Sequence, residues 1–242
     1  MSVTYPRLLP AGDTALVVEL GDAVDVAVNA RVRALDRLIA ASSVAGIIET
    51  VPTNRSLMVV YEPLALSHGA LVAAIERLLR ALPEHPAESG GRGWIVPAVY
   101  GGAYGTDLGA VGAMLGLDEA AVIARHAERE YRVFMIGFQP GFAYLGVLDP
   151  SLAVSRHAAP RPEIPAGTVS IAGNQTVINS VAAPSGWALI ARTPARLFDP
   201  RRSDPFLLAA GDRVRFRPVP AAAWTALAAR AEAGDRVAEA AP

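Results

Sequence analysis

The first part of the chain shows two hydrophobic periods, one typical of strands and one typical of helices. Short runs rich in Val, Ile and Leu between turn residues predict strands, whereas apolar residues that recur every three or four positions predict amphipathic helices. The segments follow in the order strand, helix, strand, strand, helix at residues 14–20, 24–39, 46–51, 56–61 and 71–82. This order predicts an α+β domain of ferredoxin type (β-α-β-β-α) over residues 1–85, with 94–99 as a possible sixth element.

The pattern changes at a polar stretch, residues 84–93, which contains three glycines and one proline and is the predicted boundary between two domains. Residues 108–115 then predict a short helix. A second helix is predicted to begin after Asp118, a suitable N-cap, and to extend to about Tyr131.

Beyond Val133 helical periodicity is weak, and short apolar runs alternate with Gly, Pro, Asn and Asp. Many short strands separated by turns favour a barrel or a sandwich. The clearest predicted strands are residues 169–172, 176–178, 187–191 and 213–217. We therefore expect a mainly β domain over residues 90–220, followed by a C-terminal helix and tail over 221–242 that contains Trp224.

The composition excludes several kinds of chemistry. All 22 basic residues are arginines, and the net charge of −1 gives no electrostatic reason to expect a nucleic acid or an anionic membrane as partner. Without lysine the chain cannot supply a P-loop lysine, a Schiff base or a biotinyl-lysine, and without cysteine it cannot supply a thiolate. The N-terminal residues lack the pattern of a signal peptide, and no apolar stretch approaches the roughly 18 residues of a spanning helix, so we expect a cytoplasmic protein.

The four histidines do not occur at spacings typical of metal ligands, so no metal site is expected. His126 and Glu130 are four residues apart on the predicted second helix and would be able to form a hydrogen bond. Packing at the surface or between the domains is the favoured alternative for this pair.

The densest unusual stretch is Gly-Phe-Gln-Pro-Gly-Phe-Ala-Tyr-Leu at residues 137–145. Two glycines and a proline restrict the backbone path, and three aromatic side chains are presented along it. The stretch would be either a barrel corner whose rings fill the core or a loop that lines a small-molecule pocket. The substrate-binding residues of such a pocket would be Phe138, Pro140, Gly141, Phe142 and Tyr144.

Arg161 lies in a proline-rich run, Pro-Arg-Pro-Glu-Ile-Pro. A rigid backbone would hold its guanidinium ready to bind a carboxylate or a phosphate through two parallel hydrogen bonds. The alternative is an ordinary structural ion pair with Asp149, Glu163 or Asp199.

Two amides follow in the run Ile-Ala-Gly-Asn-Gln-Thr. The side chains of Asn174 and Gln175 each offer a donor and an acceptor, which suits recognition of a lactam or a urea-like amide. Asn174 beside Gly173 equally fits a turn, and this alternative is favoured for Asn174 more than for Gln175. Arg192 and Asp199 complete a polar set that would converge on the same pocket.

Four motifs, at residues 138–145, 164–176, 192–199 and 211–214, together resemble a known family. Their patterns are similar to GFxPGFxYL, VPAGSVxIAGxQT, RTP followed by LFD, and GDxV of the PxpB/KipI-like family. This is the family of 5-oxoprolinase B subunits, also called allophanate hydrolase subunit 1 or carboxyltransferase-domain proteins. The resemblance extends over about residues 10–220.

The resemblance implies a small α+β domain followed by a cyclophilin-like barrel. It also implies partners, a PxpC-like protein (allophanate hydrolase subunit 2) and a PxpA-like subunit, with which the chain would open 5-oxoproline to glutamate at the expense of ATP. The chain alone would be inactive, and ATP would be bound with the partner subunit. The catalytic residues would be Gln175, Arg161 and Arg192, with Arg161 or Arg192 holding a carboxylate or phosphate and Gln175 the amide. Further substrate-binding residues would be Pro165, Gly167, Gly173, Asn174 and Thr176.

The chain departs from the family pattern at Val177, Asn179, Ser180 and Ser185. These positions fall in or beside the predicted pocket, where a different small amide or carboxylated substrate would be accommodated. One alternative function is a carboxyltransferase half that acts on urea or a similar amide with carboxybiotin, whose carrier would be another polypeptide because this chain lacks lysine. The other is a non-enzymatic inhibitor of a sensor histidine kinase.

Overall fold

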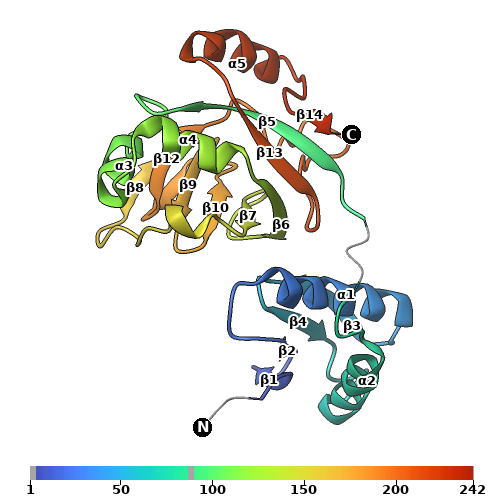
Figure 1. Cartoon of the computed structure of the whole chain (residues 1–242). Helices are drawn as coiled ribbons and strands as arrows, with labels where there is room; N and C mark the ends of the chain where they lie inside the picture. Colours follow the sequence, from blue (N-terminus) through green and yellow to red (C-terminus); the bar gives the residue numbers. More distant parts are fainter. Residues whose placement is uncertain (1–3, 87–89, 242) are drawn as a thin grey trace. The chain divides into compact units, whose positions relative to one another are not determined.

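The computed structural model describes residues 4–86 and 90–241, which belong to two compact units, 1–89 and 90–242 (Figure 1). Residues 87–89, within the predicted boundary, lie outside the described residues, as do 1–3 and 242. No helix in the described part of the chain is long and apolar enough to cross a membrane.

The N-terminal unit is a four-stranded antiparallel sheet that packs against two helices. Its elements are β1 (Arg7–Ala11), β2 (Ala15–Glu19), α1 (Val26–Ser42), β3 (Ile47–Pro52), β4 (Ser56–Tyr61) and α2 (His68–Ala81). The strand order is β1-β2-β4-β3. Alternate residues of β2 and β4 and the apolar faces of both helices form one core that includes Leu16, Val18, Leu35, Leu57 and Ile75.

The predicted order strand, helix, strand, strand, helix is present from β2 to α2, but the unit differs from the prediction at one edge. The outer place beside β2 is taken by β1, a strand that the sequence did not predict because Pro10 interrupts it. Residues 94–99, the possible sixth element, form part of a strand in the other unit, so that prediction is wrong.

The C-terminal unit is built around a seven-stranded barrel. Its strands are β5 (Gly93–Tyr100), β6 (Glu130–Ile136), β7 (Ala143–Gly146), β9 (Thr168–Ala172), β10 (Gln175–Ile178), β12 (Ala188–Arg192) and β13 (Arg213–Pro218). They follow the order β12-β9-β10-β7-β6-β13-β5, and pairing of β12 with β5 closes the ring. The predicted mainly β barrel is confirmed.

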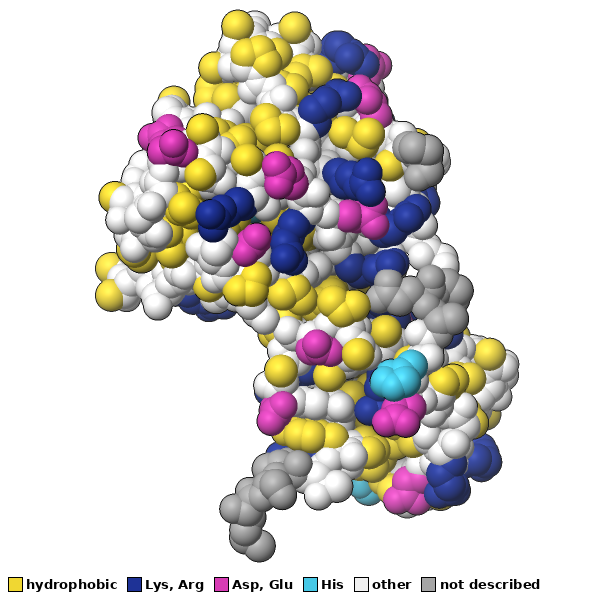
Figure 2. Space-filling view, in the orientation of Figure 1, with side chains coloured by type: hydrophobic (Ala, Val, Ile, Leu, Met, Phe, Trp, Pro, Cys, Tyr) yellow, Lys and Arg dark blue, Asp and Glu magenta, His cyan; other side chains and the backbone are white. Residues whose placement is uncertain are grey.

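Apolar side chains fill this barrel. Alternate positions along the strands point inward, as the two-residue period requires. The buried core includes Val96, Val133, Leu145, Ile171, Ile178, Ile190 and Val214, one residue from each strand. Outside the barrel, Arg and acidic side chains are interspersed on the face shown in Figure 2.

Smaller elements surround the barrel. They are α3 (Leu108–Leu115), α4 (Glu119–Ala127), η1 (Pro150–Leu152), β8 (Arg161–Ile164), β11 (Ala183–Ser185), η2 (Ala221–Ala223), α5 (Trp224–Glu232) and β14 (Glu239–Ala241). The final strand was not predicted: β14 pairs with β5, so the C-terminal segment belongs to the barrel sheet rather than forming a separate tail.

Helix α4 is shorter than predicted. Asp118 caps it as expected, because its side chain accepts a hydrogen bond of 2.7 Å from the Ala121 amide. The helix ends at Ala127, and Glu130 already belongs to β6. His126 and Glu130 therefore do not share a helical face, and Glu130 instead forms an ion pair of 3.2 Å with Arg215.

His126 is the centre of a buried polar network. The Thr176 hydroxyl donates to the Ser170 carbonyl (3.2 Å) and therefore accepts from His126 Nε2 (3.0 Å). Nδ1 is then the acceptor for the Tyr100 hydroxyl at 2.7 Å. The Tyr131 hydroxyl donates to the His126 carbonyl at 2.9 Å. Burial lowers the pKa of His126 to about 3, so the imidazole is neutral in the folded protein at neutral pH.

This neutral histidine makes the barrel sensitive to acid. Between pH 6.5 and 3 the unfolded chain binds a proton at His126 that the folded chain does not. The free energy of unfolding therefore falls by about 1.4 kcal/mol for each unit by which the pH is lowered in this window. We expect His126→Gln to be less stable than the wild type at pH 7.5 but to lose less stability between pH 6.5 and 5. Urea unfolding at several pH values measures how the free energy of unfolding of each protein depends on pH. His85→Gln, at an exposed position, should keep the wild-type slope, and parallel curves for all three proteins would contradict the prediction.

Candidate functional site

A cavity of about 550 Å³ lies where one end of the barrel meets α5, and we call it the α5 pocket. Arg192 at the end of β12 pairs with Thr168 at the start of β9, so the segments before β9 and after β12 meet there. Helix α5 supplies another wall through Trp224 and small alanine side chains. The lining residues used below are Ala166, Gly167, Ser180, Arg192, Thr193 and Trp224.

Arg192 is held in this pocket by two contacts. Its Nε donates to the Ala166 carbonyl at 2.8 Å, and its guanidinium carbon lies 4.9 Å from the centroid of the Trp224 ring. Burial lowers the pKa of Arg192, which reflects incomplete solvation of the cation. No carboxylate in the described part of the chain pairs with this guanidinium, so its terminal nitrogens are available to an anionic ligand.

A second polar group in the pocket is the hydroxyl of Ser180. It is buried and has no hydrogen-bond partner among residues 4–86 and 90–241. The preceding Asn179 is 1% exposed, and neither atom of its amide group has a protein partner in the same ranges. A buried polar group without a partner costs about 1–3 kcal/mol, so the Ser180 hydroxyl favours a ligand or water that offers a hydrogen bond, whereas Asn179 does not line this cavity.

Gly167 allows the two segments beside Arg192 to approach each other closely. Its φ is +79°, and a Cβ atom there would lie 2.1 Å from the Thr193 carbonyl oxygen. The Gly167 amide donates to the Asn179 carbonyl (2.8 Å), and the Thr193 amide donates to the Gly167 carbonyl (2.8 Å). The glycine therefore fixes the pocket wall through both its conformation and its lack of a side chain.

Substitution of Gly167 tests this arrangement. Gly173 is a matched control, because its φ is +56° but no heavy atom lies within 4 Å of the Cβ position. We expect Gly173→Ala to cost about 1 kcal/mol from backbone strain and Gly167→Ala about 3 kcal/mol or more, because a clash with backbone is added. Urea denaturation measures the free energy of unfolding of both variants. Equal losses for the two variants would show that the close approach is unimportant.

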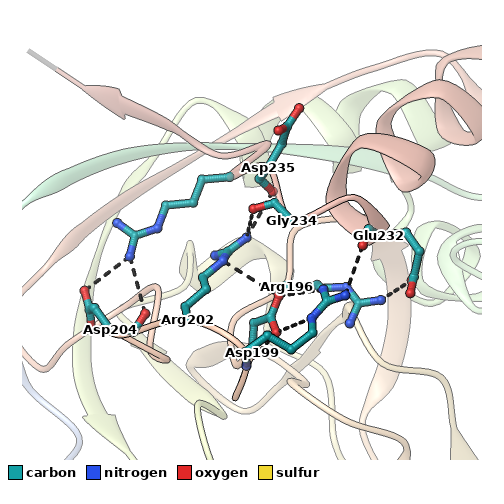
Figure 3. A network of polar contacts seen from close by, with 9 residues as sticks. Arg196, Asp199, Arg202, Asp204, Glu232, Gly234 and Asp235 are labelled. Carbon is teal, nitrogen blue, oxygen red and sulfur yellow. Dashed lines mark hydrogen bonds and ion pairs between the residues drawn. The ribbon is translucent and has the colours of Figure 1, made fainter.

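Helix α5 is fixed to the segment after β12 by arginine contacts, which Figure 3 shows. Arg196 forms an ion pair with Glu232 at the end of the helix. The Glu232 carbonyl accepts from Arg201 at 3.1 Å, and the Gly234 carbonyl accepts from Arg202 at 2.9 Å. These contacts hold the wall that carries Trp224 against the barrel.

Asp199 belongs to this network rather than to the pocket. Both of its carboxylate oxygens accept 2.8 Å hydrogen bonds from Arg201, which hold the pKa of Asp199 well below its usual range. Arg202 adds a longer contact of 3.7 Å. The predicted convergence of Asp199 with the amides of residues 174–175 is not seen.

A second cavity, of about 330 Å³, is lined by the aromatic side chains of the 137–145 stretch, and we call it the aromatic pocket. The rings of Phe138 and Phe142 are 5.6 Å apart, and those of Phe142 and Tyr144 are 4.7 Å apart. Trp187 forms another wall, with the Arg156 guanidinium 5.2 Å from its ring. Phe138 is 67% exposed and has a φ of +68°, a strained conformation for a bulky residue.

Arg161 lies in neither pocket. Its guanidinium donates to Asp107 at 2.6 Å, a partner that differs from the three acidic residues considered from the sequence. Asp107 also accepts from the Leu189 amide (2.8 Å) and contacts His157 (3.3 Å). Arg161 therefore already has a carboxylate partner inside the protein, although one of its terminal nitrogens is buried without a partner among the described residues.

Gln175 lies at the opposite end of the barrel from Arg192. Gln175 begins β10 and pairs with Gly146 and Ala172. The other end of β10 pairs with the first residues of β9, where Thr168 pairs with Arg192. The length of β10 separates the two side chains, so they do not form one constellation.

The remaining predicted residues have backbone or interior roles. Gly173 and Asn174 form the turn between β9 and β10, which was the favoured alternative for Asn174. Thr176 points into the barrel toward His126. The predicted residues that line neither pocket are Pro140, Gly141, Arg161, Pro165, Gly173, Asn174, Gln175 and Thr176.

The predicted binding residues are thus divided between two pockets: Gly167 and Arg192 lie in one, and Phe138, Phe142 and Tyr144 in the other. The sequence did not predict that Trp224 contributes to the site. The spacing of Trp224, Ala228 and Ala231 on one helical face is the signal that would have indicated it, because small residues there leave room for a cavity. Within the described ranges no three His, Asp or Glu side chains are placed to hold a metal ion.

Comparison with known proteins places this chain in a family. A family model described as carboxyltransferase domain, subdomain C and D, matches residues 6–208. Three 5-oxoprolinase B subunits are 35%, 37% and 43% identical to this chain. The B subunit of Escherichia coli O157:H7, at 43% identity, is matched over 86% of this chain and 93% of its own length.

Two solved structures resemble this chain. The crystal structure of TTHA0988 is 37% identical with a TM-score of 0.73 over 85% of this chain, which spans only 40% of that longer chain. The Kluyveromyces lactis urea carboxylase, at 17% identity, shares the fold with a TM-score of 0.78 over 97% of this chain and 24% of its own. The chain therefore belongs to the PxpB/KipI-like family of carboxyltransferase-domain proteins, whose relatives named above are 5-oxoprolinase B subunits.

Proposed function

We propose that this chain is the B-type subunit of an ATP-dependent 5-oxoprolinase and opens 5-oxoproline to glutamate together with other subunits. The observation that carries the proposal is its 43% identity to a 5-oxoprolinase B subunit over 93% of that protein. The partners are a PxpC-like protein (allophanate hydrolase subunit 2) and a PxpA-like subunit. The chain alone is expected to be inactive.

The chemistry explains why one chain is not enough. A five-membered lactam is a stable amide, and coupling to ATP hydrolysis, for example by phosphorylation of the lactam oxygen, makes ring opening favourable. This chain has no lysine for a P-loop, so we assign the principal ATP contacts to a partner subunit. The contribution of the chain is to bind and orient the acidic lactam, for which an arginine and neutral polar groups are suitable.

The test is reconstitution. The chain is co-expressed with the C-type and A-type subunits of the same organism, and glutamate formation from 5-oxoproline and ATP is measured. We expect activity that disappears when this chain, either partner or ATP is omitted. A well-formed complex of all three subunits that produces no glutamate would refute the proposal.

A second candidate is a carboxyltransferase half that acts on urea or a similar amide. The name of the matched family and the fold shared with urea carboxylase favour it. Because the chain lacks lysine, carboxybiotin would have to arrive on another polypeptide. The same complex is therefore also assayed with a carboxylated biotin carrier and urea, and carboxyl transfer without glutamate formation would select this function.

A further inference from the structure

Arg192 differs from the other arginines around α5. Arg196, Arg201 and Arg202 each contact a carboxylate. Among residues 4–86 and 90–241, the guanidinium of Arg192 contacts only a carbonyl oxygen and the face of Trp224. A cation stacked on an indole and bonded through Nε keeps its terminal N–H groups in one orientation. These groups face a cavity, so the arrangement is suited to a carboxylate ligand.

The rest of the α5 pocket complements a small polar ring. The hydroxyl of Ser180 can donate or accept a hydrogen bond, and no other group in the described part of the chain satisfies it. Pro194, Ala228 and Ala231 line the cavity with apolar surface. A volume of about 550 Å³ lies within the usual range of small-molecule sites.

One wall of the pocket lies outside the segment that defines the family. The family match ends at residue 208, whereas α5 begins at Trp224. Helix α5 thus adds a surface from beyond the matched segment to a cavity whose other walls include the motifs at residues 164–167 and 192–194.

We propose that the α5 pocket binds a small carboxylated amide, with Arg192 as the carboxylate anchor and Trp224 as the residue that positions it. The identification of this ligand with 5-oxoproline rests on the proposed function. Helix α5 then contributes to ligand selection, because the Trp224 ring holds the Arg192 guanidinium in place. Without the ring, Arg192 would keep its charge but lose its fixed orientation.

The first test is direct binding to the full-length chain, and to its complex with the partner subunits, by isothermal titration calorimetry. The ligands are 5-oxoproline and 2-pyrrolidinone, the same lactam without the carboxylate. We expect 5-oxoproline to bind at least about 10-fold more tightly, as a charged hydrogen bond implies. Equal affinities in both preparations, or no binding in either, would overturn the proposal.

Variants then locate the carboxylate. Arg192→Gln should weaken 5-oxoproline binding about 10-fold or more and leave 2-pyrrolidinone binding unchanged. Arg230→Gln on α5 is the control, because this arginine is paired with Asp235 and does not line the pocket. Trp224→Ala should reduce the preference for the carboxylate, and Trp224→Phe, which keeps an aromatic face, should largely restore it. A loss that is equal for both ligands would indicate a merely structural role.

The outcomes separate this inference from the proposed function. If the complex opens 5-oxoproline and the Arg192→Gln complex has an unchanged KM, the site is wrong and the function stands. If the chain binds the acid selectively through Arg192 but the complex forms no glutamate, the site stands and the function is wrong.

Discussion

Replacement of Asp212 by alanine is expected to lower the free energy of unfolding of the barrel by about 3–5 kcal/mol. The Asp212 side chain is buried, and its carboxylate accepts from the backbone amides of Arg92 (2.8 Å) and Ala209 (3.0 Å). It also accepts from the Trp94 indole (3.1 Å) and the Arg92 guanidinium (3.2 Å). Alanine would leave the two backbone amides and the indole without this acceptor, whereas the Arg92 guanidinium would keep the Leu207 carbonyl. Each buried donor that loses its partner costs about 1–3 kcal/mol.

Urea unfolding followed by circular dichroism measures this loss. Asp212→Asn keeps the shape and one acceptor oxygen, so a smaller loss is expected. Asp204→Ala removes an exposed carboxylate that pairs with Arg92 and Arg236, and a change below about 1 kcal/mol is expected. A loss of less than about 1 kcal/mol for Asp212→Ala would show that the network is unimportant to the barrel.

The second large effect concerns catalysis by the reconstituted complex. Arg192→Gln is expected to lower kcat/KM for 5-oxoproline about 100-fold, mainly through KM, because the carboxylate would lose a charged partner worth about 1.5–3 kcal/mol. Steady-state kinetics of glutamate formation measure the change. A loss confined to kcat would instead assign Arg192 to the reacting centre.

Arg161→Gln provides the contrast, since both arginines were predicted from the sequence as candidate catalytic residues. Its guanidinium is bound to Asp107, so the substitution should lower the unfolding free energy while KM stays close to the wild-type value. If Arg161→Gln raised KM as much as Arg192→Gln, the structural assignment of Arg161 would be wrong.

Features that depend on neighbouring residues were predicted well from the sequence. The bounds of α3 and β4 coincide with the predicted segments, and Asp118 caps α4 as its side chain requires. These elements are determined by local periodicity and by side chains that bond to nearby backbone. The end of α4 was missed because Glu128, Arg129 and Glu130 all favour helices and no Gly or Pro follows Ala127 to end one.

Features that depend on distant residues were not predictable. Nothing near Arg161 in the sequence indicates that its partner is Asp107, and nothing near Arg192 indicates Trp224. The motifs supply some of the lining residues, Gly167 and Arg192 in one pocket and Phe138, Phe142 and Tyr144 in the other. The sequence alone could not show that Gln175 and Arg192 lie at opposite ends of the barrel, because that follows from the strand register.

The pairing of β5 with β13 has a consequence for synthesis of the protein. Gly93 pairs with Arg213, so one of the first residues of the barrel cannot form its strand pairing until one of the last has been synthesised. The N-terminal unit pairs only segments within residues 7–61 and can fold while translation continues. The barrel cannot close until residue 218 has left the ribosome, and contacts so far apart in sequence form slowly. During that interval the edges of β5 lack their partners, and nascent chains are most prone to aggregation or to capture by chaperones at this stage.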